Sequence, residues 1–340
     1  MDIPTGSERM DWADFMEFSN RQGVVGLVYG GLERSGMRIP QMTLFEWIGF
    51  AEKIKAQNKV VNKRIVQVAK IFEEKGCGYV MMKGQANSLM YPRPELRSPG
   101  DIDVWVTTDI SGRKYGSLDE TAQIINMILK ECPDAHYSIN HVKMPVFDDV
   151  SVEVHYSPSH LINWFKDLKL QRYIQTVVEK EFRHKVRIDG YEVGAMTDYF
   201  NIIYQLLHMY GHFFTTRNNF KQFVDYYFLL KKGHTDFTDF TDKLREFGLL
   251  RYAEGMMWVM KEVLGLEEKY LYVKPDEKVG RIILSESMRF GTFAENKLKQ
   301  VIQQFAGNLR LVRYFPSEVL ISPLFLIWHQ WWKIKVKLFI

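Results

Sequence analysis

The sequence predicts an α+β protein with a helical N-terminal region, a small core of strands and helices, and a helical C-terminal domain. Three observations support this class. Apolar residues recur every three or four positions up to about residue 76, short apolar runs dominate residues 77–195, and helical spacing returns after residue 195. The predicted units are therefore residues 1–76, 77–195 and 196–340, which suits a chain of 340 residues.

The N-terminal region is predicted to contain two helices. The first covers residues 11–32, where paired glycines interrupt the apolar spacing. The second begins at Thr43, because Thr43 and Glu46 have the spacing of a capping box, and it ends at Gly76.

The central region is predicted to alternate between short strands and helices. Strands are expected at residues 79–82 and 102–106, and two more between 136 and 155, with Asp148-Asp149 at the turn. Helices are expected at residues 85–91 and 119–131. Prolines between residues 92 and 99 predict an irregular loop.

The C-terminal domain is predicted to be entirely helical, with Thr197 capping its first helix. The expected helices cover residues 198–212, 219–232, 239–247, 251–264, 277–290 and 293–312.

Composition indicates a folded protein without a broad cationic surface. The chain is 46% hydrophobic, and 45 basic residues nearly balance 41 acidic ones. This balance argues against binding of long duplex nucleic acid, although a nucleotide needs only a local pocket. Two cysteines cannot form a disulfide scaffold, and the first residues lack the pattern of a secretory signal. A cytoplasmic location is therefore expected.

The end of the chain, residues 320–340, is aromatic and apolar but contains several lysines. These charges interrupt the apolar run that a membrane span requires, so no integral span is predicted. Two interpretations remain: a terminal helix packed on the protein itself, or peripheral contact with a bilayer through Trp328, Trp331 and Trp332.

Three acidic residues form the candidate chemical centre. Asp101 and Asp103 lie two apart on a predicted strand, so both carboxylates project from one face, which is expected to be exposed. Glu153 lies on a later strand that can pair beside the first. Clustered carboxylates favour a hard divalent cation, Mg²⁺ above all with Mn²⁺ as a substitute. Two such ions can position a nucleophile and a leaving oxygen around a phosphorus atom.

Residues before this centre are candidates for phosphate binding. Lys83 and Gly84 join a strand to a helix, whose first amides can face an anion. Ser88 on that helix and Gly100 beside the acids add possible polar contacts. Arg97 can meet a triphosphate through its planar guanidinium. The alternative to phosphate binding is that Lys83 is a solvated residue at the end of a strand.

Four segments together resemble a bacterial nucleotidyltransferase family of the DNA polymerase beta-like superfamily. They are Met82-Lys83-Gly84, Leu89-Met90-Tyr91-Pro92, Arg97 through Val104, and Val152-Glu153-Val154-His155. The resemblance covers most of the chain and implies a mixed β-sheet core with flanking helices. It also implies that Asp101, Asp103 and Glu153 bind two Mg²⁺ ions and a nucleoside triphosphate. The sequence has Gln85 where the superfamily has a second glycine or a serine, and Glu153 where aspartate is commoner.

Four further residues are candidates for the cleft between the core and the helical domain. His155 shares a face with Glu153 and is either a phosphate or metal neighbour or a core histidine. His208 and His212 have the spacing of a zinc pair but lack an evident third ligand, which favours a cleft role. Asp225 can face that cleft and meet one of these histidines, cap a loop, or pair with Lys221.

The predicted reaction is Mg²⁺-dependent transfer of a nucleoside monophosphate from a nucleoside triphosphate (NTP) to an acceptor, with release of pyrophosphate. A catalytically silent module that binds a nucleotide or a partner is the alternative, and phosphoryl transfer is a third hypothesis. The expected acceptor is a small molecule or a protein rather than long nucleic acid, because the net charge is only +4.

Overall fold

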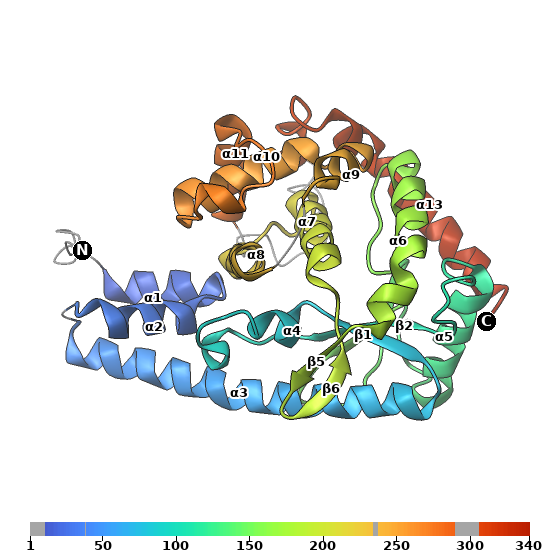
Figure 1. Ribbon diagram of the computed structural model, residues 1–340, viewed down its shortest axis with the longest axis horizontal. Helices are drawn as coiled ribbons and strands as arrows, with labels where there is room; N and C mark the ends of the chain where they lie inside the picture. Colours follow the sequence, from blue (N-terminus) through green and yellow to red (C-terminus); the bar gives the residue numbers. More distant parts are fainter. Residues whose placement is uncertain (1–10, 38, 234–236, 290–305) are drawn as a thin grey trace.

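The computed structural model describes residues 11–37, 39–233, 237–289 and 306–340. Helices cover both sides of a small sheet, with one helical group at the N-terminus and another in the C-terminal half (Figure 1). The predicted α+β class is confirmed. Most of the helix predicted at residues 293–312 lies outside the described residues, although residues 306–309 are helical.

The N-terminal region contains three helices: α1 (Trp12–Arg21), α2 (Val25–Ser35) and α3 (Gln41–Glu74). The single helix predicted at residues 11–32 is therefore two helices. The prediction of a cap at Thr43 is also wrong, because α3 begins at Gln41 after Pro40. Trp47 on the early part of α3 is fully buried in the cluster it shares with α1 and α2. A cap contributes only about 1 kcal/mol, so this packing decides where the helix begins.

The main sheet is mixed and has four strands in the order β1–β2–β4–β3. Their bounds are β1 (Gly78–Met82), β2 (Ile102–Thr107), β3 (His141–Lys143) and β4 (Val152–His155). β2 is antiparallel to β1 and parallel to β4, and β3 is antiparallel to β4. A parallel pair requires a crossover, and α5 (Leu118–Glu131) lies on that connection.

The two faces of this sheet bury different apolar clusters. Met81 and Val104 belong to the cluster that includes residues of α3 and α5. Val80 and Trp105 point the other way, into a cluster with α6 (Trp164–Arg183) and α7 (Asp198–Phe214). Figure 1 shows α3 along one side of the sheet and α6 and α7 on the other. The candidate side chains that share a face with Trp105, such as Asp103, therefore point toward α7 and the C-terminal helices.

One helix and one hairpin are absent from the prediction made from the sequence. They are α6 and the antiparallel pair β5 (Lys185–Ile188) and β6 (Tyr191–Gly194). Leu170, Ile174 and Val178 bury one side of α6 in the large cluster. The hairpin then leads to α7, where Thr197 occupies the cap position but donates its hydroxyl to Glu181 at 2.7 Å.

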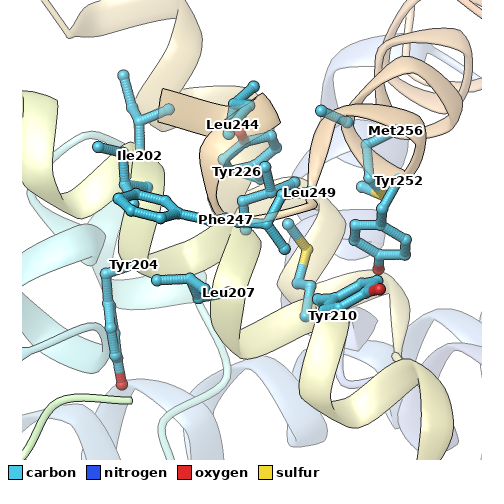
Figure 2. Packing of buried hydrophobic residues seen from close by; sticks show 14 of the residues in the cluster. Ile202, Tyr204, Leu207, Tyr210, Tyr226, Leu244, Phe247, Leu249, Tyr252 and Met256 are labelled. Carbon is cyan, nitrogen blue, oxygen red and sulfur yellow. The ribbon is translucent and has the colours of Figure 1, made fainter. Parts of the chain in front are cut away.

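The C-terminal helices pack around α7. They are α8 (Phe220–Lys232), α9 (Phe240–Glu246), α10 (Leu250–Trp258) and α11 (Glu277–Ser287). Figure 2 shows Leu207 of α7, Tyr226 of α8 and Tyr252 of α10 within this cluster. Its aromatic residues hold α7 and α8 in fixed positions, and both helices also line the pocket described below.

The last helix, α13 (Pro316–Lys337), packs against α5 of the core. The ring of Trp332 stacks on Tyr156 with centroids 6.0 Å apart, and Val336 is fully buried. Among the helices in the described part of the chain, none is both long and apolar enough to span a bilayer.

Candidate active site

The register of the sheet places the three candidate acids together. Asp103 on β2 lies directly opposite Glu153 on β4, and Asp101 comes immediately before β2. Alternate residues of a strand share a face, so both aspartates project from the same side. One oxygen of each of the three carboxylates lies within 4.8 Å of the others.

Asp103 and Asp101 differ in exposure. Asp101 is exposed, but only 2% of Asp103 is accessible to solvent, so the expectation that both face solvent is wrong for Asp103. Lys83 Nζ lies 3.0 Å from Asp103 Oδ2, and His155 Nε2 lies 3.0 Å from Oδ1. Burial opposes ionisation of Asp103, but Lys83 and His155 outweigh it and lower the pKa of Asp103 below its usual range.

The three carboxylates fit a hard divalent cation such as Mg²⁺. Asp103 Oδ2 is buried and makes no hydrogen bond of suitable geometry with a described residue, although the ammonium of Lys83 is close. Burial and the charge of Asp103 raise the pKa of Glu153. A cation with oxygen ligands relieves the part of that shift that comes from repulsion between the carboxylates.

Lys83 and Gly84 form the turn between β1 and the short helix α4 (Gly84–Ser88). Their φ angles are 46° and 56°. Glycine adopts such angles freely, whereas for a lysine they cost on the order of 1–3 kcal/mol. A β-carbon on Gly84 would meet only the carbonyl oxygen of Asp101, 3.8 Å away. The turn therefore leaves open space beside the acids, and its strained residue carries the ammonium paired with Asp103.

A pocket opens in front of these residues, between the sheet and the C-terminal helices. Its lining comes from the β1–α4 turn, the segment leading into β2, and helices α7 and α8. The lining residues are Lys83, Gly84, Arg97, Gly100, Asp101, Asp103, Gln205, His208, His212, Asn219, Lys221, Gln222 and Asp225. Carboxylates and cations thus meet in one pocket, which suits an anionic ligand that carries its own divalent cation.

Arg97 and Asp225 line this pocket as a buried ion pair. Arg97 Nε and Nη2 donate to the two carboxylate oxygens of Asp225, each at 2.7 Å. Tyr91 Oη also donates to Asp225, at 2.5 Å. Arg97 and Asp225 are 3% and 4% exposed. The structure therefore joins two residues for which the sequence suggested separate partners, a triphosphate for Arg97 and a histidine or lysine for Asp225.

Ser88 does not reach the pocket. Its side chain is buried, and its hydroxyl donates to the carbonyl oxygen of Gln85 at 2.7 Å. Gln85 also points away, because its Nε2 donates to Asn62 of α3 at 2.6 Å. The short helix therefore offers the pocket Gly84 but neither of these side chains.

His208 and His212 both line the pocket from α7. Their rings pack edge to face with centroids 4.4 Å apart. Lys83 Nζ lies 3.4 Å from His208 Nε2, and His212 Nδ1 lies 2.5 Å from Thr216 Oγ1. Burial and the charge of Lys83 lower the pKa of His208 well below its usual range and that of His212 to about 4. Both rings are therefore neutral at pH 7.

His155 is buried beside the acids and is not among the residues that line the pocket. Its Nε2 faces Asp103, and it also lies 3.9 Å from Glu153 Oε2. Its neighbour His141 on β3, which the sequence did not single out, lies 3.7 Å from the same oxygen. Burial and His155 lower the pKa of His141 to about 4.

Lys221 lines the pocket, whereas the sequence indicated it only as a possible partner of Asp225. It lies on the first turn of α8, and its Nζ would be 3.5 Å from a β-carbon on Gly100. Burial and the nearby Arg97 lower the pKa of Lys221 to about 8. The available signal was its spacing: Lys221 and Asp225 are four apart and share one face of the helix.

Comparison with known proteins identifies a family. A family described as "Uncharacterised nucleotidyltransferase" matches residues 8–265. Among solved structures, an antigenic nucleotidyltransferase-like protein from Paracoccidioides brasiliensis is similar at 13% sequence identity and a TM-score of 0.41, over 65% of this chain and 96% of that chain. A comparison with curated proteins gives no match.

Proposed function

The chain belongs to this uncharacterised nucleotidyltransferase family, and we propose that it transfers a nucleoside monophosphate from an NTP to an acceptor hydroxyl. The acceptor oxygen bonds to the α-phosphorus, and the bond from that phosphorus to the bridging oxygen breaks. Pyrophosphate leaves with the bridging oxygen. This chemistry is that of the DNA polymerase beta-like superfamily, which the motif around Asp101 resembles.

One observation carries the proposal. The carboxylates of Asp101, Asp103 and Glu153 lie within 4.8 Å of one another. The pocket that two of them line also contains three cationic side chains, those of Lys83, Arg97 and Lys221. A triphosphate with bound Mg²⁺ needs both features, since the metal requires oxygen ligands and the remaining phosphate charge requires cations.

Each residue has a proposed role. Asp101, Asp103 and Glu153 would hold two Mg²⁺ ions, which supply charge stabilisation for the transferred phosphoryl group when bound. Glu153 accepts the proton that the acceptor hydroxyl loses. Lys83 and the backbone of Gly84 bind the β- and γ-phosphates, together with Lys221. The neutral His208 and His212 shape the acceptor side of the pocket.

Isotope position tests the reaction class directly. The full chain with MgCl₂ is incubated with each NTP labelled at either the α- or the γ-phosphorus, alone and with panels of small molecules and proteins. Nucleotidyl transfer moves the α-label into product and releases pyrophosphate. Product that carries the γ-label instead would show phosphoryl transfer. Binding of NTP without pyrophosphate release would identify a silent nucleotide-binding module.

Lys221→Met should raise the KM for the NTP about tenfold or more and change kcat less. A charge-assisted hydrogen bond contributes about 1.5–3 kcal/mol, and each 1.4 kcal/mol is a factor of ten in affinity. Steady-state kinetics measure the effect. Lys232→Met is the matched control, because Lys232 is exposed at the far end of the same helix. Equal KM values for the two variants would show that Lys221 does not bind the phosphates.

The same lysine predicts a pH dependence. Burial and Arg97 hold the pKa of Lys221 at about 8, against the opposing carboxylates of Asp225 and Asp101. The ammonium is present below that pH and lost above it, so kcat/KM for the NTP should fall as pH rises through about 8. The corresponding inflection should be absent in Lys221→Met. An unchanged inflection in the variant would assign it to another group.

A further inference from the structure

We propose that His141, Glu153 and His155 form a second metal site, which binds a transition metal ion of the zinc type. The site shares Glu153 with the proposed magnesium ligands and adds two imidazoles that the proposed transfer does not use. One nitrogen or oxygen of each residue lies within 4.8 Å of the others. Binding of this ion does not require a nucleotide, so the site can be tested without any transfer reaction.

The sheet register creates this cluster. β3 runs antiparallel to β4, with His141 opposite His155 and Lys143 opposite Glu153. Residues two apart on a strand share a face, so all four side chains lie on the face that bears Asp103. The pattern His-x-Lys on one short strand against Glu-x-His on the next therefore places two imidazoles beside one carboxylate.

The distances suit an ion that binds these atoms. Glu153 Oε2 lies 3.7 Å from His141 Nε2 and 3.9 Å from His155 Nε2. Zinc binds imidazole nitrogen and carboxylate oxygen at about 2.0–2.2 Å, which separates tetrahedral ligand atoms by roughly 3.4 Å. The two distances to Glu153 exceed that spacing by a few tenths of an ångström, and the two imidazole rings lie with their centroids 5.1 Å apart.

Outer contacts orient the ligands. His141 Nδ1 lies 3.2 Å from the side-chain oxygen of Asn140 and 3.2 Å from Ser138 Oγ. A carbonyl oxygen can only accept, so Nδ1 carries the proton and Nε2 directs its lone pair toward Glu153. Lys143 Nζ lies 3.6 Å from the other oxygen of Glu153. Hydrogen bonds such as those of His141 Nδ1 are typical of histidines that bind metals.

His155 requires a change of tautomer. Its Nε2 faces Asp103 Oδ1 at 3.0 Å, whereas its buried Nδ1 has no hydrogen-bond partner among the described residues. When Nε2 binds the ion, the proton moves to Nδ1. That nitrogen has no partner among the described residues in either tautomer, while Asp103 Oδ1 gives up the hydrogen bond from Nε2 and the Asp103 carboxylate keeps its contact with Lys83.

The two proposed metal sites differ in the atoms that would bind the ion. Two imidazole nitrogens and one carboxylate suit zinc and its neighbours, whereas three carboxylates suit magnesium. Glu153 then binds a zinc-type ion through Oε2 together with the histidines of β3 and β4, and its other oxygen remains for the proposed magnesium site.

Calorimetric titration with ZnCl₂ tests the site. The full chain is stripped of metal with a chelator and titrated without nucleotide or magnesium. We expect one zinc ion per chain, and His141→Ala should weaken its binding by at least about 100-fold, beyond the 10- to 100-fold that loss of an outer contact causes. Asn140→Ala should weaken it within that smaller range. His136→Ala is the matched control, because His136 is an exposed histidine in the segment before β3.

The outcomes are separable. Wild-type chain that binds no zinc, or His141→Ala that binds it like wild type, overturns the site. Circular dichroism of metal-free His141→Ala checks that the variant is folded, and a zinc-soaked crystal with anomalous density between the three side chains gives an independent measurement. Asp101→Asn should retain zinc. If the chain binds zinc but transfers no nucleotide, only the proposed function is refuted. If the chain transfers nucleotide with magnesium but does not bind zinc, only this inference is refuted.

Discussion

Asp101→Asn should lower the rate of nucleotidyl transfer by at least about 10³-fold. A metal ion stabilises the developing charge of the transition state by several kcal/mol, and each 1.36 kcal/mol corresponds to a factor of ten in rate. Removal of one carboxylate charge from the proposed ligand set should remove most of that stabilisation. The measurement is transfer of the α-label, together with calorimetry of Mg²⁺-NTP binding.

The stability of this variant should not change by more than about 0.5 kcal/mol, because Asp101 is exposed. Asp134→Asn, an exposed aspartate in the turn before β3, is the control for charge alone. Asp103→Asn is a poorer test, since Asp103 is buried against Lys83 and its loss leaves a half-buried ammonium unpaired. Transfer at the wild-type rate by Asp101→Asn would contradict the assignment of the metal ligands.

Asp225→Ala should destabilise the protein by about 3–5 kcal/mol, the cost of leaving one partner of a buried ion pair without its counter-charge. Both nitrogens that Arg97 presents to Asp225 lose their acceptor, and so does the hydroxyl of Tyr91. The pair also joins the segment before β2 to α8, so its loss separates the core from a helix that lines the pocket. Urea denaturation measures the change in free energy of unfolding.

Two controls isolate the buried charge. Arg97→Met combined with Asp225→Leu should recover most of the lost stability, because apolar residues of similar volume often replace a buried pair without cost. Arg281→Ala removes an exposed pair with Glu277 and should cost less than about 1 kcal/mol. If Asp225→Ala unfolds like wild type, the pair does not stabilise the fold, and weaker NTP binding by that variant would instead assign Asp225 to positioning Arg97 in the pocket.

Much of the fold follows from apolar spacing. The strands around Met81 and Val104 and the long helix that ends near Glu74 were readable, because local burial patterns predict them. The signal for α6 was also present, since Leu170, Ile174 and Val178 recur every four positions. The first residue of α3 was not readable. A local cap is weak, and packing of Trp47 against α1 and α2 outweighs it.

The sequence by itself determined that Asp101 and Asp103 share one face of a strand and that Glu153 and His155 share one face of another. Side chains alternate between the two faces of any strand, so two residues at that spacing share a face whichever strand pairs beside them. The sequence also determined the family, because a family is recognised from the order and spacing of residues along the chain, which do not depend on the fold.

Only the tertiary structure decided which of these groups meet. The register that sets Asp103 opposite Glu153, and His141 opposite His155, depends on strand pairing. Arg97 and Asp225 are 128 residues apart, so their pairing depends on how α8 packs on the core. From the sequence alone, Asp101 and Asp103 are two acids at strand spacing. In the folded chain they line one pocket, where α8 brings Lys221 to the same space as Lys83 and Arg97.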